Sequence, residues 1–157
     1  MTVRVLFVCL GNICRSPMAD GVFQEMVDDA GLSAQIQVDS AGTGDWHIGD
    51  QAHAGTRAIL AAHDIDYNGR SRQISPADMA DPKTYIIAMD SSNINDINGR
   101  FPPHPRLYRL LDFATETDTR DVPDPYYHNN FETVYDLVQD GCRGLLAMIC
   151  EQEELSA

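Results

Sequence analysis

The first thirty residues constrain the fold most strongly, because they read as a buried strand, a short loop and a helix in direct succession. The run Val3–Val8 is apolar and rich in β-branched residues apart from Arg4, which is typical of a strand buried on both faces of a parallel sheet. Ser16 and Pro17 suit the N-cap and the first position of a helix. Apolar residues then follow at helical spacing until Gly31, which predicts the end of that helix: Ala19, Val22, Phe23, Met26, Val27 and Ala30.

The rest of the chain continues to alternate between strand and helix patterns. Residues 36–38 indicate a short strand and residues 55–63 a helix. Residues 85–89 are a third apolar run before the helix cap Asp90, and residues 107–113 contain another short strand candidate. The segments rich in Pro, Asp and Asn, which we expect to be loops, are residues 99–105 and 115–130. The last helix carries one apolar stripe: Phe131, Val134, Tyr135, Val138, Cys142, Leu145, Leu146 and Ile149. We therefore predict a single α/β domain over residues 1–157, with a parallel sheet and helices on both faces.

The charge of the chain excludes two classes of partner. Its 157 residues contain 11 Lys and Arg against 24 Asp and Glu, a formal net charge of -13. Nucleic acids and anionic membranes both need a basic face, so neither is an expected partner. Any anion site in this chain must be built locally, from backbone N–H groups and one or two well-placed cations.

Cysteine usage and the N-terminus predict a cytoplasmic protein. The four cysteines, Cys9, Cys14, Cys142 and Cys150, form no CxxC pair and no regular framework. The N-terminal residues lack the features of a signal peptide, and the apolar runs are far shorter than a membrane span. We expect free thiols in a reducing compartment.

The loop after the first strand carries the chemistry. It places a thiol at Cys9, a guanidinium at Arg15 and a hydroxyl at Ser16. Backbone N–H groups of a loop that enters a helix N-terminus can hold an anion, and the same field favours a thiolate. The planar fork of Arg15 can clamp two phosphate oxygens, and Gly11 and Asn12 tolerate the positive φ that a tightly curled loop requires. This pattern predicts thiolate attack on phosphorus.

Such a reaction needs an acid that protonates the leaving oxygen, and the loop near residue 124 offers two candidates. These are Asp121 and Asp124. Pro123 and Pro125 flank Asp124, which biases it to an extended conformation and presents its carboxyl group rigidly.

Several motifs together resemble the low-molecular-weight protein tyrosine phosphatase family. They are residues 8–17, residues 39–43, Trp46, residues 89–90 and residues 124–127, so the resemblance covers nearly the whole chain. It implies a four-stranded parallel sheet flanked by helices and hydrolysis through a phosphocysteine, with no metal and no cofactor.

The resemblance also implies the role of each site residue. Cys9 is the nucleophile, Arg15 binds phosphate and stabilises the transition state, and Asp124 is the acid for the leaving phenol and then the base for water. Trp46 and Tyr126 should wall the slot for the phenol ring, which favours a flat leaving group. The full set of expected substrate-binding residues is Leu10, Gly11, Asn12, Ile13, Cys14, Ser16, Trp46, His47 and Tyr126.

Residues around the loop are expected to support it. Ser16 should hydrogen-bond the Cys9 thiolate, and Asn12 should lock the loop with help from Ser40. Cys14 resembles the family's second loop cysteine, which can trap an oxidised nucleophile as a disulfide. Many family members carry a His where this chain has Gly69, so we expect a shorter or water-filled support network and a looser loop.

Other functions remain open at this point. A protein-arginine phosphatase resembles this chain but carries Thr where Ile13 stands. An arsenate reductase would need a thiol relay, and there is no cysteine between Cys14 and Cys142. A phosphocysteine carrier would have no use for Arg15 together with Asp124, and a phosphotyrosine-binding module without turnover would have lost its nucleophile or acid.

The expected partners follow from the phosphatase interpretation. They are phosphotyrosine-containing proteins, with a tyrosine kinase as a reasonable partner for a bacterial member, and inorganic phosphate is the product. We expect a monomer or a weak dimer. The histidines show no metal-ligand spacing. Tyr126 and Tyr127 are expected to contribute to the pocket wall and to packing.

Overall fold

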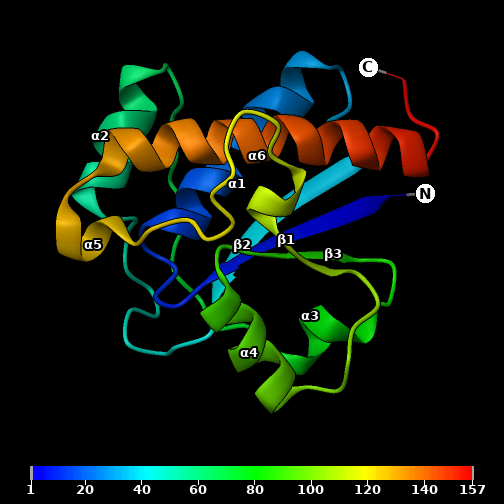
Figure 1. The fold of residues 1–157 in the computed structure, drawn as a ribbon, viewed down its shortest axis with the longest axis horizontal. Helices are drawn as coiled ribbons and strands as arrows, with labels where there is room; N and C mark the ends of the chain where they lie inside the picture. The colour runs from blue at the N-terminus through cyan, green and yellow to red at the C-terminus, as the bar shows by residue number, and fades with distance from the viewer. Residues whose placement is uncertain (1, 157) are drawn as a thin grey trace.

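The computed structural model describes residues 2–156, with the side chain of Tyr127 outside the described part. Its elements follow the predicted alternation of strands and helices (Figure 1). In chain order they are β1 (Val3–Cys9), α1 (Arg15–Asp29), β2 (Ile36–Gly42), α2 (Ala54–Ala62), α3 (Pro76–Ala80), β3 (Tyr85–Ala88), α4 (Ser91–Arg100), β4 (Leu107–Arg109), the 3-10 helix η1 (Leu110–Phe113), α5 (Pro125–His128) and α6 (Phe131–Gln152).

Within the described residues, the strands form one four-stranded parallel sheet in the order β2-β1-β3-β4. Val5 of β1 pairs with Val38 of β2 on one side and with Tyr85 of β3 on the other. The strand β1 therefore lies inside the sheet, where both of its faces are covered, and this explains its nearly continuous apolar sequence. The predicted fold class is confirmed.

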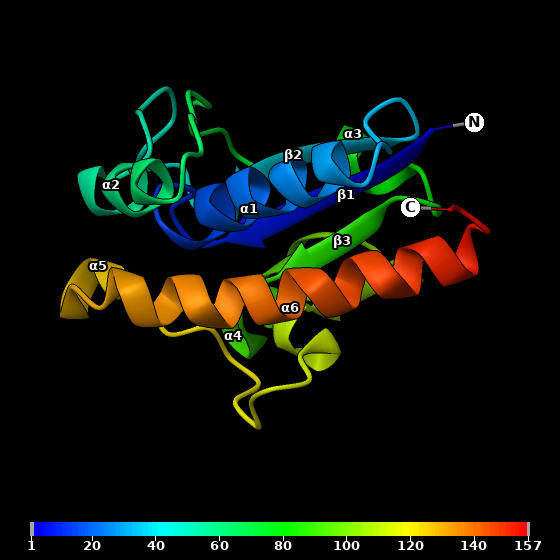
Figure 2. The same cartoon turned by 90° about the horizontal axis from the view of Figure 1, so that it is seen from above.

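Helices cover both faces of the sheet, and alternate residues of β1 point to the two sides. Phe7 packs edge-on against Phe23 of α1, with ring centroids 5.5 Å apart, in a core shared with α6. Leu6 and Val8 point the other way, into a smaller cluster with Ile97 of α4. Figure 2 shows α1 and α6 side by side along one face, and α3 and α4 lie beyond the opposite face. Two cores thus fix the sheet from both sides.

Three local predictions are corrected by the structure. The helix α1 begins at Arg15 with Cys14 as its N-cap, so Ser16 lies inside the first turn and is not the cap. A short helix, α3, begins at Pro76 in a segment for which the sequence analysis predicted no element. The expected loop 115–130 contains one helical turn, α5, which starts at Pro125.

Among the described residues, none of the helices combines the length and apolar character that crossing a bilayer requires.

The packing of α6 depends on small residues where η1 crosses it. A Cβ added to Gly144 would lie 1.8 Å from the carbonyl oxygen of Phe113, and one added to Gly141 would lie 2.6 Å from Leu110 Cγ. These glycines let the two backbones approach closely, and the contact anchors the segment that leads toward residue 124.

Substitution at Gly144 tests this packing. We expect Gly144→Ala to destabilise the protein by about 1–3 kcal/mol, because overpacking outweighs the better helix propensity of Ala. Gly99→Ala is the matched control, since it also lies in a helix but nothing surrounds its Cβ position within 4 Å. The control should be neutral or stabilising by up to about 1 kcal/mol. Urea unfolding measures both, and equal effects of the two changes would contradict the close approach.

Candidate active site

The loop between β1 and α1 lies at the carboxyl edge of the sheet and points the Cys9 thiol inward. Cys9 Sγ is 3.1 Å from Ser16 Oγ and accepts the backbone N–H of Asn12 at 3.3 Å. Only 3% of Cys9 is exposed. Ser16 therefore sits in the first turn of α1, where its hydroxyl reaches the thiol, which is the contact that the sequence analysis expected. Both the Asn12 N–H and the Ser16 hydroxyl therefore lie within hydrogen-bonding distance of the sulfur.

Asn12 provides the left-handed backbone that lets the loop curl. Its φ is 56°, a conformation that Asn tolerates better than most residues. Gly11, the other expected position, does not have a positive φ; instead, a Cβ at Gly11 would lie 3.2 Å from the ring of His47. The loop thus needs Asn12 for its turn and Gly11 for space beside His47.

The side-chain amide of Asn12 fixes the hydrogen bonds beneath the loop. Its Nδ2 donates to Ser16 Oγ at 2.8 Å and to Ser40 Oγ at 3.0 Å, and its Oδ1 accepts the backbone N–H of Arg72 at 3.0 Å. Ser16 Oγ accepts from Asn12 and lies within hydrogen-bonding distance of Cys9 Sγ, so its own proton is available to the thiol. The predicted support by Asn12, Ser16 and Ser40 matches this geometry.

The support network is not shortened at Gly69, contrary to expectation. The hydroxyl of Tyr67 lies 3.4 Å from Ser40 Oγ and donates to Asp20 Oδ2 at 3.0 Å. A Cβ at Gly69 would lie only 2.4 Å from the Tyr67 hydroxyl oxygen. The side chain of Tyr67 occupies the space near this position, and Gly69 leaves room for it.

Asp20 is the last hydrogen-bond acceptor of the network beneath the loop, and it accepts from the hydroxyl of Tyr67. Burial raises the pKa of Asp20 to about 6, although hydrogen bonds from Tyr67 and Ser40 act in the opposite direction. Asp20 is therefore mostly ionised at neutral pH. Burial and the neighbouring Asp20 raise the pKa of Tyr67, so the Tyr67 hydroxyl keeps its proton and donates it.

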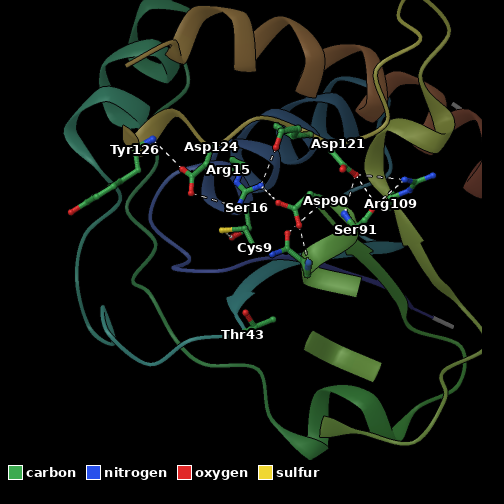
Figure 3. Close-up of polar contacts among 12 residues, drawn as sticks. Cys9, Arg15, Ser16, Thr43, Asp90, Ser91, Arg109, Asp121, Asp124 and Tyr126 are labelled. Carbon is green, nitrogen blue, oxygen red and sulfur yellow. Dashed lines mark hydrogen bonds and ion pairs between the residues drawn. The ribbon is translucent and has the colours of Figure 1, made fainter. Parts of the chain in front are cut away.

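Arg15 is buried beside the thiol and held by acidic partners. Its Nη1 is 2.5 Å from Asp90 Oδ2 and donates to the carbonyl oxygen of Val122 at 3.0 Å, and its Nη2 is 3.7 Å from Asp124 Oδ2 (Figure 3). Burial by itself would lower the pKa of Arg15, but the charges of Cys9, Asp90 and Asp124 outweigh it and raise the pKa. The guanidinium is thus a permanent cation in an acidic chain.

The two candidate acids have different surroundings. Asp124 is the N-cap of α5, where its Oδ1 accepts the backbone N–H of Tyr126 at 3.0 Å, and it lines the same pocket as Cys9 and Arg15. Asp121 does not line that pocket; its carboxylate faces Ser91 instead. Of the two, Asp124 alone is placed to reach a group bound over Cys9.

A pocket of about 410 Å³ opens above the thiol. Its lining residues are Cys9, Leu10, Gly11, Ile13, Cys14, Arg15, Trp46, His47, Asp124 and Tyr126. Asn12 and Ser16, which were also expected to touch substrate, are absent from this lining, and their side chains belong to the support network below it. The pocket therefore combines a thiol and a guanidinium with aromatic and aliphatic walls.

The outer walls of the pocket are exposed aromatic side chains. Trp46 is 69% exposed and Tyr126 is 50% exposed. The ring of His53 stacks on Phe131 at 5.1 Å and meets Tyr126 edge-on at 5.8 Å, so the Tyr126 wall is backed by a packed pair. His47 lies 3.2 Å from Asp50 and 6.4 Å from the Tyr126 ring. Flat apolar walls around a polar floor suit an aromatic ring joined to an anion.

The two loop cysteines differ in their ionisation. Burial raises the pKa of Cys14 to about 12, and the charges of Cys9 and Asp124 add to this effect. Cys14 therefore stays a neutral thiol. Among the described residues, we find no group of three or more His, Cys, Asp or Glu that could hold a metal ion.

Comparison with known proteins identifies the family. The family model for low molecular weight phosphotyrosine protein phosphatases matches residues 4–155. The chain belongs to this family. A relative from Bacillus subtilis, the low molecular weight protein-tyrosine-phosphatase YfkJ, is 47% identical over 98% of this chain and 99% of its own. PtpA of Staphylococcus saprophyticus, another low molecular weight protein-tyrosine-phosphatase, is 45% identical over 98% of this chain and 97% of its own.

Solved structures agree with the family assignment. The crystal structure of YfkJ from Bacillus subtilis matches with a TM-score of 0.92 at 46% identity, covering 97% of both chains. A structure described as a drosophila arginine phosphatase matches with a TM-score of 0.83 at 31% identity, covering 92% of this chain and 96% of that one. Both resemblances extend over the whole fold that positions the Cys9 loop.

Sequence reasoning missed several residues of this phosphatase-family site. Asp90 was recognised as a helix cap, but its bond to Arg15 joins residues 75 apart in the sequence. Asp20 lies on α1 and Tyr67 in the loop between α2 and α3, so they meet only in the folded chain. No local pattern marks such contacts, because neither propensity nor spacing records which loop reaches which helix face.

Replacing Tyr67 tests whether the network extends beyond Ser40. We expect Tyr67→Phe to slow alkylation of Cys9 by iodoacetamide near pH 6 by about two- to fivefold, because Ser40 loses a hydrogen-bond partner and the Asn12 amide is held less firmly. The measurement is alkylation rate against pH. Tyr108→Phe, which removes a hydroxyl from a half-buried Tyr on β4, should leave the profile unchanged. An unmoved profile in Tyr67→Phe would mean that Ser40 ends the functional network.

Proposed function

We propose that this chain hydrolyses phosphotyrosine in proteins through a phosphocysteine formed on Cys9. The observation that supports this most directly is the convergence of three groups on one pocket: the Cys9 thiol, the Arg15 guanidinium and the Asp124 carboxyl group. Each comes from a different part of the chain, and each suits one requirement of phosphoryl transfer.

In the first step, the Cys9 thiolate attacks phosphorus while the bond to the phenol oxygen breaks. Arg15 and the backbone N–H groups of the loop hold the equatorial oxygens, where negative charge must be neutralised. Asp124, in its protonated form, gives its proton to the leaving phenolate. The products of this step are free tyrosine hydroxyl on the protein substrate and a phosphocysteine.

In the second step, water attacks the phosphocysteine. Asp124, now a carboxylate, takes a proton from the water as its oxygen bonds to phosphorus and the sulfur–phosphorus bond breaks. Inorganic phosphate leaves, and Cys9 returns as a thiolate stabilised by Ser16 and the Asn12 N–H. The acid is again protonated for the next cycle.

The walls of the pocket favour an aromatic leaving group. Trp46 and Tyr126 can sandwich a phenol ring, whereas an aliphatic phosphoserine would leave their faces uncovered. The substrates we propose are therefore phosphotyrosine proteins, including an autophosphorylated tyrosine kinase.

The cysteines of the loop bear on the compartment and on protection from oxidation. A nucleophile that works as a thiolate suits the reducing cytoplasm, where we place the protein. Cys14 neighbours the nucleophile in the loop and is the thiol that we propose to trap an oxidised Cys9 as a disulfide.

Two rival activities fit the site less well. The resemblance to a drosophila arginine phosphatase brings phosphoarginine into consideration, but Ile13 presents an aliphatic side chain to the pocket, where it cannot hydrogen-bond a guanidinium. Arsenate reduction needs a thiol relay, and Cys142, the next cysteine along the chain after Cys14, is fully buried on α6 with its thiol facing Ala19.

Hydrolysis assays in EDTA test the function and the roles together. We expect phosphotyrosine peptides to be hydrolysed much faster than phosphoarginine or phosphoserine peptides. Cys9→Ser should abolish turnover, and Asp124→Ala should reduce it by about 10²–10⁴-fold, the usual contribution of a general acid. Preference for phosphoarginine would favour the rival activity. A stable phosphoprotein on Cys9 without turnover would contradict the phosphatase mechanism.

A further inference from the structure

The segment that carries Asp124 has to be fixed relative to Arg15, although it contains little regular structure. Residues 114–124 connect η1 to α5 without a helix or strand of their own. The carboxylate of Asp124 is occupied locally by the N–H of Tyr126 and lies 3.7 Å from Arg15 Nη2. These contacts orient the side chain. The start of the segment is held elsewhere, because Asp140 accepts the backbone N–H groups of Thr115 and Glu116 at 3.0 and 2.9 Å. Arg120 also donates to the carbonyl oxygen of Leu111 at 2.6 Å, so the residues just before Asp124 need attachments of their own at the site.

Val122 attaches the segment to the site at one point. Its backbone N–H donates to the carbonyl oxygen of Met89 at 2.9 Å, and its carbonyl oxygen accepts from Arg15 Nη1 at 3.0 Å. Val122 is 1% exposed. Pro123 and Pro125 restrict the dihedral angles between Val122 and Asp124, so the direction in which the chain leaves Val122 depends on how the residue before it is held.

Asp121 supplies a second attachment, one residue earlier. Its Oδ1 accepts both the backbone N–H and the hydroxyl of Ser91, each at 2.9 Å. Ser91 is the first residue of α4, so its N–H has no acceptor within the helix and lies at the positive end of the helix dipole. A carboxylate is the side chain best suited to that position.

Arg109 of β4 closes this cluster. Its Nη1 donates to Ser91 Oγ at 2.9 Å and lies 3.5 Å from Asp121 Oδ1. Figure 3 shows Asp121, Ser91 and Arg109 grouped on one side of Asp90, with Arg15 and Asp124 on the other. Because Asp90 is the N-cap of α4 and also binds Arg15, the same helix end contacts both the phosphate clamp and the acid segment.

We propose that Asp121, bound to Ser91 and Arg109, is a positioning residue that holds the general acid Asp124 at the pocket; this rests on the proposed function. Asp121 is three residues before Asp124, and Val122 between them is already fixed. Together, Asp121 and Val122 determine both the place and the direction of the last residues before Asp124. Its side chain is 53% exposed and that of Arg109 is 31% exposed, so their ion pair adds little to global stability.

The proposal makes a specific kinetic prediction. A displaced acid matters most when the leaving group is poor, because a good leaving group departs without a proton. We expect Asp121→Ala to lower kcat/KM for phenyl phosphate by about tenfold and for 4-nitrophenyl phosphate by less than about twofold, part of the usual general-acid contribution. The ratio of the two values from one preparation does not depend on how much of the variant is folded.

Three further variants complete the experiment. Asp121→Ala should cause no additional loss in an Asp124→Ala background, because Asp121 acts through that residue. Asp121→Asn keeps an oxygen that can accept from Ser91. Its ratio of the two kcat/KM values should therefore stay close to that of the unaltered protein. Asp112→Asn is the matched control: Asp112 also pairs with Arg109, at 3.1 Å, but lies on η1, and its ratio should equal that of the unaltered protein.

Each outcome decides between specific alternatives. Equal losses on both substrates, or a further loss in the Asp124→Ala background, would overturn the positioning role and leave the phosphatase proposal intact. Absence of any aryl phosphate hydrolysis by the unaltered protein would overturn the proposed function and the positioning role together. A selective loss that disappears in the Asp124→Ala background supports the proposal.

Discussion

The Asn12 amide is the interaction on which the site depends most. A strand that ends at Cys9 has to turn into a helix that begins at Arg15, and the turn requires one residue in the left-handed region. Asn12 takes that conformation and then uses its amide oxygen and nitrogen to join the loop to Arg72, Ser16 and Ser40. A buried amide with these partners is costly to rearrange, so the loop keeps one shape and the Ser16 hydroxyl stays directed at the thiol.

A second constraint resolves how an acidic chain holds an anion. With a net charge of -13, the protein as a whole repels phosphate. The site provides a local positive potential from the buried Arg15, the N-terminus of α1 and the backbone N–H groups of the loop. The acidic residues nearby are not simply surplus charge: Asp90 fixes the guanidinium and Asp124 completes the pocket. The N-terminus of α4 connects Arg15 to the segment that carries Asp124, because Asp90 binds Arg15 and Ser91 binds Asp121 in that segment.

Much of the fold and the centre of the site could be predicted from short stretches of sequence. The run from Val3 to Val8 and the loop with Cys9 and Arg15 each encode their structure locally. The helix α3 was missed although Ser75, Pro76 and Asp78 form a local capping signal. Two other errors arose where a distant contact outweighed the local pattern. Ser16 resembles an N-cap in isolation, yet its hydroxyl serves the thiol. Gly69 resembled a missing support residue, yet it makes room for Tyr67.

The sequence alone determined the parallel α/β class, and it supplied the proposed nucleophile, the proposed phosphate-binding cation and the pair of candidate acids. These features depend on periodicity, on residue chemistry and on neighbours within a few positions. The tertiary structure decided which acid reaches the pocket, how Arg15 is held, and where the network under the loop ends. Those choices depend on contacts such as Arg15 with Asp90 and Tyr67 with Asp20, which join residues 75 and 47 positions apart. Only the packing of the whole chain brings such pairs within hydrogen-bonding distance.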